Sequence, residues 1–242
     1  MAPQRSAAGD DHPGVPTSLQ VLAHRGLLDG PDPARENLLT ALSAAAAAGF
    51  GSELDVREDA GALVLSHDPA PWAPDRDATA FLSDPPGDDL LHAFNVKDPG
   101  AVLPAVDVLA AAGALHRVFF FDVELACPDL EEAAALAAAV AARGGAVARR
   151  LSDREPALAA ILSDPQVEHV WLDEWDGPWV DAPLVARLRD AGKSTWYVSP
   201  ELHRPQPVAS LRPRWEQLRA WGAHGICTDH PMALVAALGA PA

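Results

Sequence analysis

Cysteine is scarce in this sequence, and basic residues are few. The two cysteines among 242 residues, Cys127 and Cys227, are far apart, which indicates neither a zinc knuckle nor a disulfide framework. Lysine and arginine number 18 against 34 aspartates and glutamates, so the formal net charge is −16. The field of such a chain repels nucleic-acid backbones and anionic membranes. We therefore expect neither as a main partner.

Long hydrophobic runs are also missing. No stretch of about 18 uncharged apolar residues occurs, so we expect no integral membrane segment. Residues 1–18 lack the apolar stretch of a secretory signal and are rich in proline, glycine and aspartate. These observations predict a mobile tail over 1–18, a single domain over 19–242 and a cytoplasmic location.

Short apolar segments and helical patterns alternate along the rest of the chain, in which 49% of all residues are hydrophobic. Eight segments are typical of buried parallel strands: 19–23, 51–56, 93–97, 117–122, 145–150, 168–172, 194–198 and 224–227. Seven segments have helical patterns: 37–48, 101–112, 129–142, 154–162, 181–191, 212–221 and 231–238. This alternation predicts an α/β fold, a (β/α)8 TIM barrel, with a doubly wound sheet as the alternative.

One connection departs from the pattern. Residues 66–92, between the second and third expected strands, contain five prolines and little periodicity. We expect an irregular active-site loop there, with at most a short helix.

Polar residues cluster where the first strands of the expected barrel end, which is where barrels carry their chemistry. They are His24, Arg25, Glu53, Asp55, His67, Asn95, Lys97 and Asp122. Glu53 and Asp55 are two residues apart, so both project from one face of their strand. Two such carboxylates repel each other unless a cation lies between them, and oxygen ligands suit Mg²⁺ or Ca²⁺. The alternative is that Arg25 and Lys97 pair with these carboxylates without a metal.

Five motifs strengthen the metal interpretation. "LAHRG", "REN" at 35–37, "GFGSELDVRED" at 49–59, "LSHDP" at 65–69 and "GICTDHP" at 225–231 follow one another in this order. Together they resemble the glycerophosphodiester phosphodiesterase family, TIM barrels of the phosphatidylinositol-phospholipase C-like superfamily. HRG alone is a weak signal, but the combination is specific and spans nearly the whole chain.

The resemblance implies roles for individual residues. His24 and His67 would be the acid/base pair, Arg25 and Lys97 would bind the phosphate, and Glu53 and Asp55 would bind the divalent metal.

One position differs from the family pattern. Family members usually have Glu-x-Lys on the third strand, whereas this chain has Asn95-Val96-Lys97, like a divergent bacterial subgroup. An amide oxygen can ligate Mg²⁺ or Ca²⁺, but with one negative charge fewer it should bind more weakly. We expect Asp122 to supply the missing carboxylate, with Asn95 beside it as a fourth ligand or a supporting group. A plain structural role for Asp122 is nearly as well supported.

Five further residues have secondary interpretations. Glu36 is expected to bond near the His24 loop while Asn37 caps the following helix. Trp171 and Asp173 lie where a wall could hold the alcohol of a substrate, and barrel packing is the alternative for Trp171. Asp68 is expected to orient its neighbour or to cap the following turn.

Asp229 is the last residue interpreted from its position. Because it precedes Pro231 and the last helical pattern, we expect it to act as a helix cap.

The resulting hypothesis is a metal-dependent phosphodiesterase acting on a glycerophosphodiester or a similar small phosphodiester. One histidine would deprotonate water or a neighbouring substrate hydroxyl, and the other would protonate the leaving oxygen. Two alternatives stay open: a phospholipase C- or D-type enzyme acting on a lipid head group, and a degenerate barrel that binds a phosphorylated ligand without turnover. The oligomeric state is left open.

Overall fold

The structure is a computed structural model that describes residues 19–127 and 129–239. The mobile tail expected over 1–18 lies outside the described residues.

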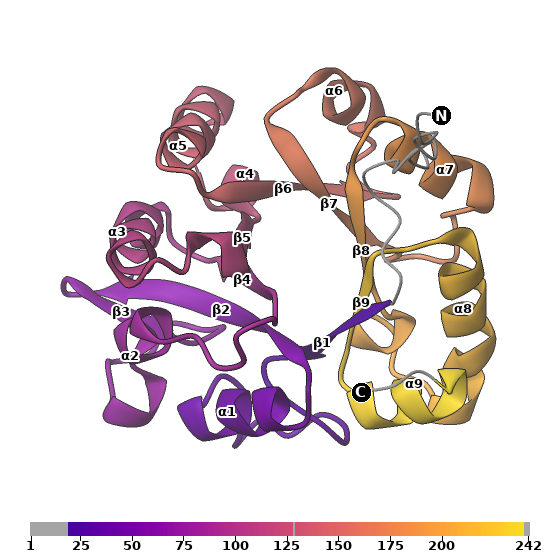
Figure 1. Cartoon of the computed structure of the whole chain (residues 1–242), viewed down its shortest axis with the longest axis horizontal. Helices are drawn as coiled ribbons and strands as arrows, with labels where there is room; N and C mark the ends of the chain where they lie inside the picture. Colours follow the sequence, from indigo (N-terminus) through magenta and orange to yellow (C-terminus); the bar gives the residue numbers. More distant parts are fainter. Residues whose placement is uncertain (1–18, 128, 240–242) are drawn as a thin grey trace, which may run out of the picture.

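A closed ring of eight parallel strands forms the centre of the fold (Figure 1). The strands are β1 (Gln20–His24), β2 (Gly51–Asp59), β4 (His92–Val96), β5 (Val118–Phe121), β6 (Ala146–Ser152), β7 (Val167–Asp173), β8 (Ser194–Val198) and β9 (Gly225–Thr228). The sheet runs β1-β9-β8-β7-β6-β5-β4-β2, and β1 also pairs with β2, which closes the ring. The fold is therefore a (β/α)8 TIM barrel, and the doubly wound alternative is wrong.

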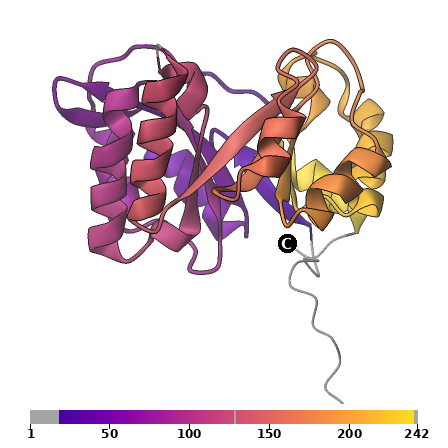
Figure 2. The ribbon, with the colours of Figure 1, turned by 90° about the horizontal axis from the view of Figure 1, so that it is seen from above.

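Helices surround the strands on the outside. They are α1 (Leu39–Ala47), α2 (Ala78–Ser83), α3 (Val102–Ala112), α4 (Val123–Ala126), α5 (Leu130–Ala142), α6 (Leu158–Ser163), α7 (Ala182–Asp190), α8 (Val208–Trp221) and α9 (Pro231–Leu238). Figure 2 shows the magenta helices of the first half and the orange to yellow helices of the second half on opposite sides of the strands. All seven expected helices are present. Helix α8 begins four residues earlier than expected, because Pro213 lies inside it rather than in its first turn.

The proline-rich connection after β2 is irregular, as expected. A short strand β3 (Ala62–Leu65) first returns antiparallel to β2. A single 3₁₀ turn, η1 (Pro74–Arg76), and the short helix α2 follow. Asp77 caps α2 by accepting a hydrogen bond from the backbone N–H of Thr79.

The barrel interior is filled by aromatic side chains below the strand ends. Phe119, Phe121, Trp171 and Trp196 are buried together, and the rings of Phe121 and Trp171 stack with centroids 4.1 Å apart. Trp171 therefore has the packing role that the sequence left as an alternative. This layer forms a rigid floor under the carboxyl ends of the strands.

The strand register brings the predicted polar residues to one end of the barrel. Glu53 of β2 lies opposite His24 of β1, and Asp55 lies opposite Asn95 of β4. Because side chains alternate along a strand, Glu53 and Asp55 emerge on the same side. The strand register alone therefore places His24, Glu53, Asp55 and Asn95 next to one another.

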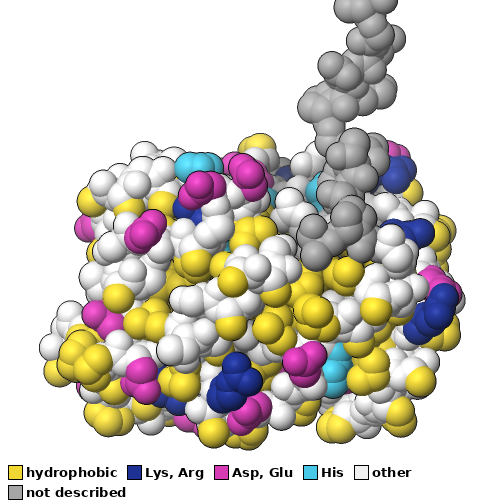
Figure 3. Space-filling view, turned by 60° about the horizontal axis from the view of Figure 1, so that its bottom comes forward, with side chains coloured by type: hydrophobic (Ala, Val, Ile, Leu, Met, Phe, Trp, Pro, Cys, Tyr) yellow, Lys and Arg dark blue, Asp and Glu magenta, His cyan; other side chains and the backbone are white. Residues whose placement is uncertain are grey.

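The outer surface is mixed in character. Figure 3 shows hydrophobic side chains over much of one face, with lysine and arginine scattered singly outside the grey atoms. Across residues 19–127 and 129–239, no helix combines the length and apolarity that crossing a bilayer demands.

Gly51 provides a test of the register between β1, β2 and β4. A Cβ atom added there would lie 2.0 Å from the carbonyl oxygen of Leu91 and 2.8 Å from Leu22 Cδ2. We expect Gly51→Ala to lower the free energy of unfolding by about 1–3 kcal/mol, because backbone must move to admit the methyl group. Urea unfolding measures the change.

Gly100→Ala is the matched control. The nearest atom to its added Cβ is Glu58 Oε2 at 3.6 Å, so we expect a change within about 0.5 kcal/mol. Equal unfolding midpoints for the two variants would contradict the register described.

Candidate active site

A cavity of about 380 Å³ opens at the carboxyl ends of the barrel strands. Its lining includes nearly all the residues that the sequence singles out: His24, Arg25, Glu53, Asp55, His67, Asn95, Lys97, Asp122, Trp171 and Asp173. These residues lie on β1, β2, β4 and β7, directly after β1, β4 and β5, and in the loop after β3. The roles assigned to them from the sequence stay predictions, but their convergence on one cavity is a property of the fold.

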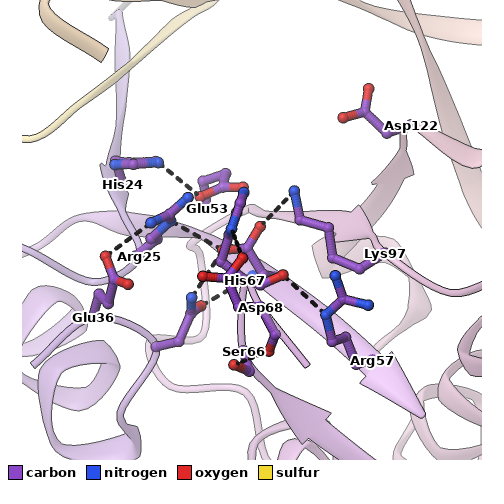
Figure 4. Close-up of polar contacts among 12 residues, drawn as sticks. His24, Arg25, Glu36, Glu53, Arg57, Ser66, His67, Asp68, Lys97 and Asp122 are labelled. Carbon is purple, nitrogen blue, oxygen red and sulfur yellow. Dashed lines mark hydrogen bonds and ion pairs between the residues drawn. The ribbon is translucent and has the colours of Figure 1, made fainter. Parts of the chain in front are cut away.

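Asp55 is the centre of an ion cluster that lines this cavity, and Figure 4 labels its cationic partners Arg25 and Lys97. Its side chain is 1% exposed, and Oδ2 lies 3.0 Å from Arg25 Nε while Oδ1 lies 3.1 Å from Lys97 Nζ. Asn37 Nδ2 donates a further hydrogen bond of 2.9 Å to Oδ2. Burial alone would raise the pKa of Asp55, but Lys97 and Arg25 hold that pKa below its ordinary value. Asp55 is therefore a buried anion with its charge balanced by two cations.

The loop after β1 is built around this cluster. Arg25 also donates through Nη1 to Glu36 Oε2 at 2.8 Å, so Glu36 bonds beside His24 as expected. Asn37 does not cap α1, because the cap position is Leu38. Its Oδ1 instead accepts a hydrogen bond of 3.0 Å from the backbone N–H of Asp55. The expected cap is thus wrong, and Asn37 links the loop to β2.

His24 is held between two carboxylates. Its Nδ1 lies 2.7 Å from Asp229 Oδ1, and its Nε2 lies 3.8 Å from Glu53 Oε2. Because Asp229 accepts, the proton on Nδ1 points at Asp229, and Nε2 faces the cavity. Burial lowers the pKa of His24, but the hydrogen bond to Asp229 and the charge of Glu53 raise it above the ordinary value.

Asp229 is therefore not the helix cap that its position suggested. The cap position of α9 is His230, and Asp229 lies at the end of β9 beside β1. Only closure of the barrel brings these first and last strands together. The motif "GICTDHP" was a usable signal for a site role, but the helical pattern beside it favoured the simpler interpretation.

His67 reaches the cavity from the loop after β3. Its side chain is 43% exposed, and Nδ1 lies 2.9 Å from Asp68 Oδ1, so Asp68 contacts its neighbour as expected. Arg57 Nε donates to the backbone carbonyl of His67 at 2.9 Å and fixes the loop at that point. The two histidines differ in environment, because His24 is enclosed and His67 faces solvent.

Three buried oxygens on neighbouring strand positions have no hydrogen-bond partner among the described residues. They are Glu53 Oε2, Asp55 Oδ1 and Asn95 Oδ1, of which Asp55 Oδ1 is the one near Lys97. Oxygen atoms without donors are what a hard divalent cation requires. No group of three or more His, Cys, Asp or Glu side chains in residues 19–127 and 129–239 is arranged to hold a metal. A cation here would depend on the amide of Asn95.

Asp122 lies apart from this set, as Figure 4 shows. Arg150 holds it with two parallel hydrogen bonds, from Nε at 2.8 Å and from Nη2 at 2.5 Å. Arg150 also contacts Asp173, whose other oxygen lies 2.6 Å from His203 Nε2. Asp122 has the left-handed backbone angle φ of 64°, which turns it toward Arg150. Its oxygens thus have a partner in Arg150, and its role as a metal ligand stays a prediction.

Arg150 and His203 were missed in the sequence. Both line the cavity; Arg150 lies in the segment "RRLSDREP", which resembles a bacterial subgroup of these barrels but suggested no role for it, and His203 lies in no motif. Alternation along β6 offered one signal, since Arg150 and Ser152 share a face and Ser152 lies opposite Asp173 of β7. No such signal was available for His203, which follows an irregular turn.

Comparisons with known proteins add little beyond the fold. No family model and no curated protein matches the chain. A glycerophosphoryl diester phosphodiesterase from Parabacteroides distasonis ATCC 8503 is similar in structure, with 14% identity, a TM-score of 0.48 and coverage of 92% of this chain and 87% of that chain. The magnesium/glyoxylate complex of Haloferax volcanii malate synthase is similar at 14% identity and a TM-score of 0.49, covering 91% and 74%. At this distance the two structures do not distinguish between activities.

The charge state of Glu53 gives a test of the site without substrate. Burial raises the pKa of Glu53 to about 7, and the neighbouring Asp55 adds to the shift. The folded state therefore holds a proton that the unfolded state releases near pH 4.5, so the free energy of unfolding should fall as pH rises through this interval. In metal-free buffer we expect wild type to lose roughly 1–3 kcal/mol relative to Glu53→Gln between pH 4.5 and pH 8.

Urea unfolding of both proteins at several pH values measures this difference. Glu155→Gln, which removes a cavity-lining carboxylate from the opposite side, is the control and should leave the pH dependence close to that of wild type. A constant gap between wild type and Glu53→Gln would show that Glu53 ionises normally.

Proposed function

We propose that this chain is a metal-dependent phosphodiesterase that acts on a glycerophosphodiester or a similar small phosphodiester. The observation that carries the proposal is the meeting in one cavity of an Asp229-bound His24, the cations Arg25 and Lys97, and the oxygens of Glu53, Asp55 and Asn95, of which Glu53 Oε2 and Asn95 Oδ1 have no donor. The five motifs quoted above also support it, because they contain His24, Arg25, Glu53, Asp55 and Asp229.

Arg25 and Lys97 would bind the anionic group of the substrate. A phosphodiester carries negative charge that grows on its equatorial oxygens during displacement, so fixed cations stabilise the transition state more than the ground state. Both side chains are about four-fifths buried and held by Asp55, which reduces the cost of ordering them when substrate binds.

His24 and His67 would transfer the protons of the reaction. Asp229 fixes the ring of His24 so that Nε2 faces the cavity, and this nitrogen can accept or donate one proton near neutral pH. His67 lines the same cavity from the loop after β3 and would serve the opposite step. The nucleophile is water or a hydroxyl of the substrate itself.

Glu53, Asp55 and Asn95 are the residues that fit a divalent cation, Mg²⁺ or Ca²⁺. When bound, such an ion would neutralise charge on the phosphate oxygens. Lys97 competes with it for Asp55 Oδ1, and the amide of Asn95 adds no charge, so we expect modest affinity.

A phospholipase-type activity on a lipid head group is the second candidate. Leu125 lines the cavity yet is 53% exposed, and Trp72, in the connection that follows His67, is 45% exposed. An exposed apolar side chain such as Leu125 in the cavity lining suits an apolar portion of the substrate.

Release of alcohol from glycerophosphocholine, glycerophosphoethanolamine and bis(p-nitrophenyl) phosphate tests the proposal. With EDTA-stripped protein we expect turnover only after Mg²⁺ or Ca²⁺ is added. His24→Ala and His67→Ala should each lower kcat by about 10²- to 10⁴-fold. Each variant should keep a urea unfolding midpoint close to that of wild type.

His116→Ala, at a residue distant from the cavity lining, is the control for histidine removal. Turnover of short-chain phospholipids alone would favour the second candidate. No turnover of any substrate by folded, metal-bound protein would favour a barrel that binds a phosphorylated ligand without reaction.

Two isosteric variants separate the candidate metal ligands. We expect Asn95→Asp to raise the affinity for Mg²⁺ roughly tenfold, because it adds a carboxylate beside Glu53 and Asp55. Asp122→Asn tests the role predicted for Asp122. A loss of Mg²⁺ affinity would indicate that Asp122 is a ligand, and an unchanged affinity would indicate that it serves only as the ion-pair partner of Arg150. Isothermal titration with Mg²⁺ measures both.

A further inference from the structure

The turn between β8 and α8 contacts the end of the last barrel strand. It contains the 3₁₀ turn η4 (Pro200–Leu202), and its Glu201 is only 8% exposed. A buried carboxylate requires partners for both oxygens, so its contacts show what it holds in place.

Both oxygens of Glu201 are occupied. Oε1 accepts from the hydroxyl of Thr228 at 2.5 Å and from the backbone N–H of Asp229 at 3.3 Å. Oε2 accepts from the hydroxyl of Ser199, which in turn accepts from the indole N–H of Trp215 at 2.8 Å. Glu201 is thus linked to α8 through Ser199 and Trp215, and it accepts hydrogen bonds from two consecutive residues at the end of β9.

Those two residues lie directly beside His24. Thr228 is the register partner of Ala23, the residue before His24, and Asp229 binds His24 Nδ1 at 2.7 Å. The hydroxyl of Thr228 also accepts from the backbone N–H of His230, so the strand end is fixed on both sides of Asp229. The Asp229 carboxylate can hold the imidazole only where this backbone places it.

We propose that Glu201 is a positioning residue for His24 that acts through Thr228 and Asp229. Its effect on turnover rests on the proposed function, whereas its effect on the orientation of His24 does not. Glu201 contacts neither the imidazole nor the candidate metal ligands, so its removal acts on His24 only through Thr228 and Asp229.

The same turn also reaches the other side of the cavity. His203, two residues after Glu201, binds Asp173 and stacks on Trp175 with centroids 3.6 Å apart. Asp173 contacts Arg150, which holds Asp122. Both ends of segment 199–203 are therefore held by side-chain contacts, Ser199 by Trp215 and His203 by Asp173 and Trp175, and these contacts fix the backbone of Glu201 between them.

The first measurement is made without substrate, at one fixed pH. In a ¹⁵N-edited proton spectrum, the Nδ1 proton of His24 should give an exchange-protected signal in wild type, and Asp229→Ala should abolish it and assign it. We expect Glu201→Ala to weaken or abolish this signal as well. Glu201→Gln should restore it, because its amide oxygen can still accept from Thr228 and Asp229.

The second measurement is kcat/KM on bis(p-nitrophenyl) phosphate. We expect Glu201→Ala to lower it about 10- to 100-fold, mainly through kcat, because a misplaced acid/base group loses its alignment with substrate. Glu201→Gln should recover most of the loss.

Glu174→Ala is the matched control. Glu174 is fully buried and accepts from the backbone N–H groups of Trp179 and Val180 and from Arg214, but it has no contact with the β9 end. It should lower stability while leaving the His24 signal intact. If Glu201→Ala and Glu174→Ala both lost the His24 signal, the loss would reflect a general loss of stability rather than positioning by Glu201, and the proposal would be wrong.

A normal His24 signal in folded Glu201→Ala would also overturn it. If that variant does not fold, Thr228→Val removes the hydroxyl with little change of shape and should weaken the same signal; an unchanged signal there has the same meaning. If wild type turns over no substrate, the proposed function fails while the spectrum still decides the positioning role.

Discussion

The neutralisation of Asp55 is the constraint on which the rest of the cavity depends. A carboxylate that is 1% exposed is costly unless cations and donors surround it, and its partners here come from the first loop and from β4. To reach it, Arg25 and Asn37 adopt left-handed backbone angles φ of 52° and 59°. Asparagine adopts such angles readily, but for arginine they are unfavourable, and the contact of Arg25 with the buried charge offsets this cost. Glu36 then balances the remaining charge of Arg25.

This charge balance explains why an amide rather than a carboxylate suits position 95 on β4. Glu53 already has a pKa near 7, because burial and Asp55 both oppose its ionisation. A third carboxylate at the Asn95 position would add to that repulsion without a further cation from the chain. Asn95 supplies an oxygen at the same place without the charge. The cavity is therefore stable without a metal, and the same oxygens stay available to one.

The sequence was sufficient to predict the barrel and most of the cavity lining, because both depend on local patterns. Apolar strands alternate with helices, and residues such as Glu53 and Asp55 mark strand ends by their spacing. The residues that were missed depend on barrel closure or on irregular turns. Asp229 meets His24 only because β9 lies beside β1, and Arg150 meets Asp122 and Asp173 only because β6 passes between their strands. Asn37 was misassigned because its side chain satisfies a distant strand instead of the adjacent helix.

The two sides of the cavity differ in what their charges can do. Around Asp55, the two cations Arg25 and Lys97 pair with the two carboxylates of Asp55 and Glu36. Around Arg150, one guanidinium is shared by two carboxylates, Asp122 and Asp173. The Arg150 side of the cavity is therefore the less favourable one for an anion, and it also presents the apolar surface of Phe121 and Trp171. In the proposed function, this asymmetry would place the anionic group of a substrate near Arg25 and Lys97, beside the His24 ring that Asp229 holds.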